Sequence, residues 1–202
     1  MRQFICILFL AFTFTGNAQS NAAPSLAGTK VTFLGLDFTQ ARFVGNVGFT
    51  DPDAIQNRIM EEWNSVLMME DEKYNLMKPL KLTKENSETN TAALMALNKS
   101  VSVKDIISNE PPSDFGADDV KKSVAKYNLK MKEGIGVAYV VETFNKLRSE
   151  AKIWVTFIDL STGKVISTDL YIGKPAGFGF RNYWLGAVTD VHTQLKKKYQ
   201  KS

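Results

Sequence analysis

Cysteine and histidine are almost missing from this sequence, which contains one of each, Cys6 and His192. Because Cys6 lies in an N-terminal segment that we expect to be removed, the mature chain has no thiol for a disulfide, a metal site or nucleophilic catalysis. A Ser-His-Asp triad also lacks support, since no Gly-x-Ser-x-Gly turn is present and Asp190 lies on a different helical face from His192. We therefore expect no catalytic residue, no metal and no cofactor.

A strong excess of one charge is missing too. The formal net charge of +4 falls to +3 without the N-terminal segment, which carries Arg2 and no acid (25 − 1 = 24 basic against 21 acidic residues). Such a mild excess does not indicate a nucleic-acid partner. The lysines at 196–198 and 201 favour a solvated helix end over an anchor for an anionic surface.

The sequence has no apolar run long enough to span a bilayer as a helix; the longest, Phe4–Phe14, follows Arg2 and precedes the small residues that end at Ala18. This order predicts a signal peptide over 1–18, with cleavage a few residues later as an alternative. A tether over 19–28 then leads into one domain over 29–202. We expect export, and no transmembrane segment in the mature chain.

The hydrophobic patterns predict an α+β sandwich in which a mixed sheet packs against helices. Its sheet should end in an antiparallel three-stranded meander, and a long amphipathic helix should close the chain. The middle is less determined: 74–82 suggests a short strand, 89–97 a helix, and 101–107 either. The clearest elements are strands over 30–38, 136–144, 151–160 and 164–172 and helices over 52–69 and 179–200.

Four acidic residues lie on or at the ends of predicted strands. Two of them facing one cleft would suit a glycosidase-like pair of carboxylates. Acids at strand ends are also common turn and capping residues, and nothing in the spacing selects a pair. These residues are Asp37, Glu142, Asp159 and Asp169.

One segment, GKPAGFGFRNYWLG over 173–186, combines glycines and aromatic residues with two cations. As a binding platform it would use Lys174, Arg181 and Tyr183 as ligand-binding residues, with free amides at a helix start. As a core crossover, its aromatic residues would fill the interior, and Arg181 would pair with an acid such as Asp169 or Asp37. The spacing of its aromatic residues favours the crossover.

The hairpin D-x-x-T-G-x-V, found here as Asp159–Val165, and the opening strand over 31–38 resemble exported bacterial envelope domains. These are the curli-secretion lipoprotein, the penicillin-binding-protein activator lipoprotein and the TolB N-terminal domain. The chain differs from the lipoproteins by lacking a lipidated cysteine. The segment over 173–186 is also similar to uncharacterised secreted proteins of Bacteroidetes-type bacteria. The resemblance implies a non-enzymatic docking or assembly module, located in the periplasm or at the cell surface of a Gram-negative bacterium.

The expected function is therefore an exported, non-catalytic interaction or assembly domain of the bacterial envelope. Its partner would be another envelope protein or a glycan. Two alternatives stay open: a carboxylate-dependent enzyme acting on glycan or peptidoglycan, and a carrier of a small ligand. The oligomeric state is open as well.

Overall fold

The computed structural model describes residues 24–200 of the chain, so the expected signal peptide and residues 19–23 of the tether lie outside the described residues. The elements are β1 (Val31–Asp37), β2 (Arg42–Val44), η1 (Asn46–Gly48), α1 (Pro52–Ala54), η2 (Ile55–Ile59), α2 (Met60–Met69), α3 (Asp71–Tyr74), α4 (Met77–Leu80), β3 (Ser87–Thr89), α5 (Ala92–Asn98), α6 (Val103–Ile106), β4 (Ile107–Ser108), α7 (Ala117–Val124), β5 (Ile135–Asn145), β6 (Glu150–Asp159), β7 (Lys164–Gly173) and α8 (Phe180–Gln200).

The central strand β5 is buried along its whole length and organises a mixed sheet. On one edge of β5, β1 and then β2 run parallel to it, so together they form one interrupted strand. The short strands β3 and β4 lie outside β1 and β2, also in parallel. On the other edge, β6 and β7 follow as an antiparallel meander.

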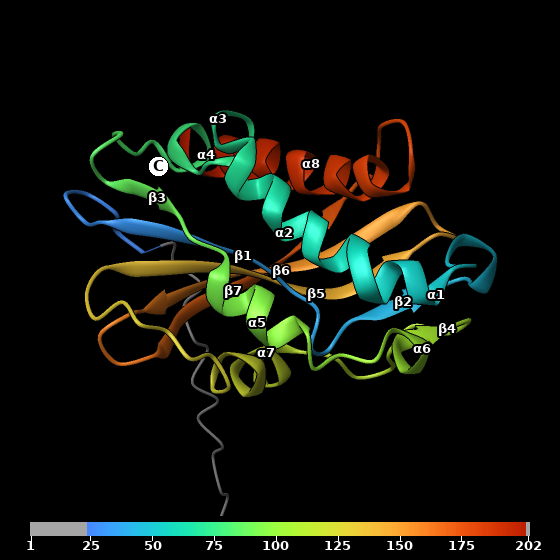
Figure 1. Ribbon diagram of the computed structural model, residues 1–202. Helices are drawn as coiled ribbons and strands as arrows, with labels where there is room; N and C mark the ends of the chain where they lie inside the picture. The colour runs from blue at the N-terminus through green and yellow to red at the C-terminus, as the bar shows by residue number, and fades with distance from the viewer. Residues whose placement is uncertain (1–23, 201–202) are drawn as a thin grey trace, which may run out of the picture.

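Helices cover both faces of this sheet, with α2 and α8 on one side and α5 and α7 on the other (Figure 1). Side chains of β5 alternate between the two cores: Tyr139 belongs to the larger one beneath α2 and α8, and Val140 to the smaller one beside α5 and α7. The predicted fold class is confirmed: the protein is an α/β sandwich with a C-terminal three-stranded meander and a long closing helix. No helix within residues 24–200 is long and apolar enough to cross a membrane.

The helix predicted over 52–69 is present, with a π-helical turn, η2, between α1 and α2. It begins where the sequence indicated, because the Asp51 side chain accepts a hydrogen bond from the Ala54 amide at 2.8 Å and Pro52 occupies the first turn. The suggested strand over 74–82 was wrong. Helices α3 and α4 occupy this segment, and Pro79 is tolerated because it lies in the first turn of α4.

Two buried asparagine side chains hold the break between β1 and β2. The Asn64 side chain accepts from the Leu36 amide at 2.7 Å and donates to the Leu36 carbonyl at 2.9 Å. Asn98 donates to the same carbonyl at 2.9 Å and accepts from the Phe38 amide at 2.9 Å. These side chains form hydrogen bonds with the backbone amides and carbonyl between β1 and β2, where neither β3 nor β4 pairs. The outer edge of this segment is therefore buried although no strand lies beside it.

Candidate functional site

The four strand acids suggested as a catalytic pair are engaged separately. Asp37 is buried and accepts a hydrogen bond from the Tyr127 hydroxyl at 2.6 Å. Burial raises the pKa of Tyr127 well above its ordinary value, so this hydroxyl stays protonated and donates. Glu142 is also buried and accepts from the Lys152 ammonium at 3.1 Å and the Trp154 indole at 2.8 Å.

The remaining two acids have structural roles as well. Asp159 accepts hydrogen bonds from Ser161 and from the Thr162 amide, which lowers the pKa of its carboxyl and shapes the turn between β6 and β7. Asp169 accepts from the Lys198 ammonium of α8 at 2.8 Å. No hydrogen bond joins any two of the four acids within residues 24–200, so they do not share a proton.

His192 lies in the core, not in a cleft. Its ring contacts Phe33 and Tyr139 edge-on, with centroids 5.9 and 5.6 Å apart. Burial lowers its pKa to about 4, so the imidazole is neutral near pH 7. Across residues 24–200, no three His, Cys, Asp or Glu side chains gather closely enough to hold a metal ion.

The segment over 173–186 behaves as a crossover between β7 and α8. Trp184 is buried and stacks on Phe144 with ring centroids 4.4 Å apart, and Phe180 packs edge-on against Phe49. A Cβ on Gly186 would collide with the backbone of Ala176, so the loop lies directly on the first turns of α8.

The three predicted ligand-binding residues of this segment do not converge on one site. The Arg181 side chain lines a groove of about 490 Å³ between α3 and the loop before α8. Tyr183 is half-buried beneath the Lys146 ammonium, which lies 3.7 Å from its ring centroid. Lys174 is exposed, and its backbone amide donates to the Asp190 carboxylate at 2.9 Å.

The expected pairing of Arg181 with an acid was wrong. Its guanidinium Nε donates to the Asn182 side chain at 3.2 Å, and the contact is exposed. The two acids suggested as partners, Asp37 and Asp169, are already bound to Tyr127 and Lys198.

Three loops meet at one end of the sheet, which we call the loop end: residues 45–51, 145–150 and 173–182. They follow β2, β5 and β7, whose carboxyl ends point the same way because these three strands share one direction. Figure 1 shows them together at the right of the molecule. The first two loops pack closely, since a Cβ on Gly45 would lie 2.9 Å from the Leu147 side chain. The sequence indicated the third loop as a candidate binding segment but did not indicate the other two.

A second candidate surface is the outer edge of β7, which we call the β7 edge. Within the described residues β7 pairs with β6 alone, over nearly all of its 10 residues. The Ile172 carbonyl points away from β6, because it accepts from the Gln194 side chain at 2.8 Å. Since backbone direction alternates along a strand, the amides and carbonyls of Thr168 and Leu170 also point outward.

Apolar side chains accompany this open backbone. Leu170 and Ile172 are 41% and 48% exposed and lie on the sheet face that α5 and α7 cover only in part. Leu170 is opposite Trp154 of β6, which is half-buried. Phe115 extends this surface, with its ring centroid 6.2 Å from that of Trp154.

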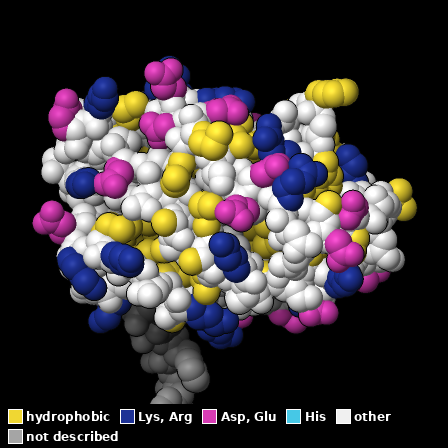
Figure 2. Space-filling view, viewed as in Figure 1, with side chains coloured by type: hydrophobic (Ala, Val, Ile, Leu, Met, Phe, Trp, Pro, Cys, Tyr) yellow, Lys and Arg dark blue, Asp and Glu magenta, His cyan; other side chains and the backbone are white. Residues whose placement is uncertain are grey.

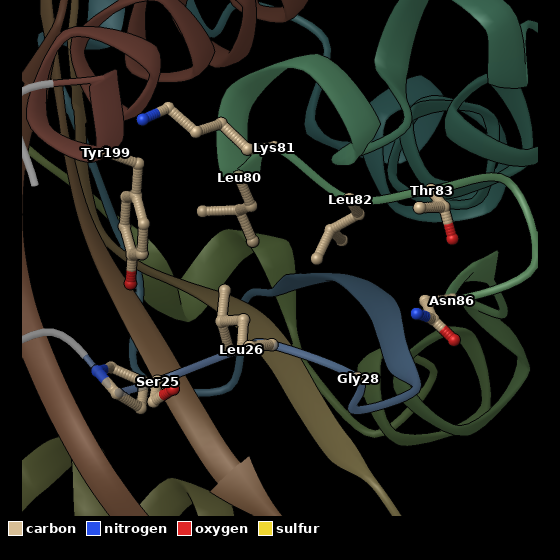
Figure 3. Close-up of a pocket in the computed structure, with 11 residues that line it drawn as sticks. Ser25, Leu26, Gly28, Leu80, Lys81, Leu82, Thr83, Asn86 and Tyr199 are labelled. Carbon is tan, nitrogen blue, oxygen red and sulfur yellow. The ribbon is translucent and has the colours of Figure 1, made fainter.

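A third feature is a groove of about 710 Å³ between the start of the domain, the segment after α4 and the end of α8 (Figure 3). Figure 3 shows Leu26, Leu80 and Leu82 converging on its floor, with Thr83 and Asn86 to one side. Leu26 belongs to the buried core, so this part of the predicted tether packs against the domain. The groove is open, and its lining mixes apolar and polar groups.

No match was found when the chain was compared with protein-family models, with curated proteins and with solved structures.

Proposed function

We propose that this protein is an exported, non-catalytic interaction or assembly domain of the bacterial envelope, and that it binds another envelope protein along the β7 edge. The observation that carries the proposal is the unpaired backbone of Thr168 and Leu170 beside the exposed Leu170 and Ile172 side chains. An edge strand with apolar side chains and no proline is a template for another strand, which natural proteins usually block when they do not use it.

The ends of β7 favour a short partner strand. A bulge leaves Ile166 without an opposite residue on β6, and the Gln194 side chain occupies the Ile172 carbonyl. Both features interrupt pairing, as they do at protected sheet edges. The free stretch between them suits a partner segment of a few residues, held by backbone hydrogen bonds and by contacts with Leu170 and Trp154.

The test is site-specific photo-crosslinking in bacteria that export the protein. A photoreactive phenylalanine analogue replaces Leu170, and in a matched control it replaces Glu61, an exposed residue of α2 on the opposite face. The proposal expects a discrete protein adduct from position 170 and none from position 61. Equal adducts from both positions, or an adduct with glycan alone, would contradict it.

A proline pair sharpens this test. Thr168→Pro removes an outward amide and should abolish the adduct while the fold is kept, because no backbone bond to β6 is lost. The change also removes the side-chain hydrogen bond between Thr168 and Thr156 of β6, so Thr168→Val, which removes that bond and keeps the amide, is the matched control. Ser167→Pro removes an amide that faces β6 and should instead destabilise the domain. If the adduct is lost only in the variant that unfolds, the β7 edge does not bind the partner.

A second candidate function, carriage of a small ligand, is favoured by the groove in Figure 3, whose volume of about 710 Å³ lies in the range of ligand sites. Its leucine floor and the nearby Lys81 suit an amphipathic carboxylate. Native mass spectrometry of the exported protein tests this candidate: a bound mass that Leu80→Arg removes would support it, and ligand-free protein would count against it.

A further inference from the structure

The loop end exposes large hydrophobic side chains at its tips. Val47, Leu147 and Phe178 are 88%, 66% and 97% exposed, and each comes from a different one of its three loops. Figure 2 shows hydrophobic side chains protruding at this end of the molecule, one group at the upper right, where the loop before α8 lies in Figure 1, and another at the right edge. Isolated exposed hydrophobic residues are common, but three on neighbouring loops at one end form a pattern.

Two of the tips follow glycines at which the backbone bends. Gly45, before Val47, has φ 99° and Gly177, before Phe178, has φ 124°, conformations that L side chains rarely adopt. The Leu147 side chain lies over Gly45, so the first two tips are neighbours. Beneath the loops, a cluster of stacked rings that includes Phe144 and Trp184 supports them. The apolar side chains of the tips therefore project from a buried, aromatic base.

The three loops carry a small excess of basic residues. Over residues 45–51, 145–150 and 173–182 the sequence has four basic residues and two acids, a net charge of 4 − 2 = +2. One of the two acids, Glu150, lies 3.9 Å from the Arg148 guanidinium, and the other, Asp51, caps α1. The basic residues are Lys146, Arg148, Lys174 and Arg181.

We propose that the loop end docks onto an anionic phospholipid surface. Val47, Leu147 and Phe178 enter the boundary between headgroups and acyl chains, and the basic residues of the three loops contact the lipid phosphates. Separate exposed apolar side chains beside basic residues suit a lipid surface, because lipids can rearrange around each inserted side chain. They fit a protein partner less well, since protein interfaces need a continuous complementary patch. This inference does not depend on the β7 edge.

The test measures insertion at each tip of the full chain. In a Cys6→Ser background, a single cysteine at Val47, Leu147 or Phe178 carries a polarity-sensitive fluorophore. The control label is at Thr162, an exposed residue in the turn between β6 and β7, at the other end of the sheet. Vesicles contain either phosphatidylglycerol with phosphatidylcholine, or phosphatidylcholine alone.

With phosphatidylglycerol vesicles, emission should shift to the blue at the three tips and stay unchanged at Thr162. Lys174→Ala and Arg181→Ala should each weaken binding about fivefold. Phe178→Ser should weaken binding, whereas Ile166→Ser, an exposed hydrophobic residue at the start of β7, should not. Lys174, Phe178 and Ile166 are exposed and Arg181 is half-buried, so each variant should melt at an unchanged temperature, which excludes misfolding.

Three results would overturn the proposal. Vesicle binding with no shift at the tips would assign the binding to the apolar N-terminal segment. Equal binding to phosphatidylcholine alone would remove the role of the cations. A shift that grows with protein concentration without vesicles would show that the tips join two copies of the chain.

Discussion

The indole Nε1 of Trp63 donates a hydrogen bond to the backbone carbonyl of Arg181 at 3.1 Å. This bond joins α2 to the first turn of α8 across the top of the larger core. It fixes the start of α8, and with it the loop that carries Phe178. The third loop of the loop end is therefore anchored by a residue that lies 118 positions earlier in the chain.

Trp63→Phe should cost more stability than Trp184→Phe. Both indoles are buried, but the Trp184 Nε1 has no hydrogen-bond partner within the described residues, so only the change at 63 breaks a bond. We expect the difference between the two losses to be about 1 kcal/mol in the free energy of unfolding. Urea denaturation measures both, and equal losses would contradict the role of the Trp63 bond.

Arg181→Ala should change the free energy of unfolding by no more than about 0.5 kcal/mol. Its guanidinium makes only an exposed contact with Asn182, and an exposed contact of this kind contributes little to stability. The carbonyl that binds Trp63 belongs to the backbone and is kept. A loss of several kcal/mol would instead reveal an acidic partner for this residue.

Asn64→Leu should be strongly destabilising although leucine has a similar volume. The change leaves the buried amide and carbonyl of Leu36 with fewer partners, at about 1–3 kcal/mol for each group left unsatisfied. Asn128→Leu, at an exposed position, is the matched control and should have almost no effect. Similar melting temperatures for the two variants would show that Asn64 does not hold the break in the strand.

His192 should make the protein less stable in acid. Its pKa is about 4 in the folded protein, below the ordinary 6.5 of the unfolded chain, so the unfolded chain takes up the proton first. This group has no effect on stability above about pH 6.5, and it lowers stability as the pH falls toward 4, by about 3 kcal/mol in all.

His192→Leu removes this titration. The effect of the substitution on packing is measured at pH 7.5, where the histidine is neutral in both the folded and the unfolded protein. Between pH 7 and 4 the variant should then lose less stability than the natural protein. Parallel pH curves for the two proteins would mean that His192 is not buried in its neutral form.

The sequence predicts the meander and the closing helix because their signals are local. β-branched and aromatic residues fill β5, β6 and β7, and Gly163 marks the turn between the last two with φ 70°. The middle resisted prediction because its structure depends on distant partners. Asn98 binds Phe38 from 60 positions away, and β3 and β4 have only 3 and 2 residues, too few for a pattern.

The candidate surfaces were predictable only in part. The segment over 173–186 stood out by composition, but the structure places its residues at different points, with Arg181 in a groove and Tyr183 beneath Lys146. No sequence pattern predicted the β7 edge, since Leu170 and Ile172 occur in an apolar strand pattern like that of the buried Ile153. A strand lies at the edge of a sheet when no other strand pairs with its outer side. This depends on the rest of the fold, so the residues of the strand itself do not predict it.

The exchange of single backbone amides with deuterium tests the central proposal most directly. In the isolated protein, the outward amides of Thr168 and Leu170 should exchange quickly while those of Ser167 and Asp169, which face β6, exchange slowly. In the complex recovered from the bacterial envelope, the amides of Thr168 and Leu170 should become slow as well. If they stay fast in a complex that protects other residues, the β7 edge is not where the partner binds.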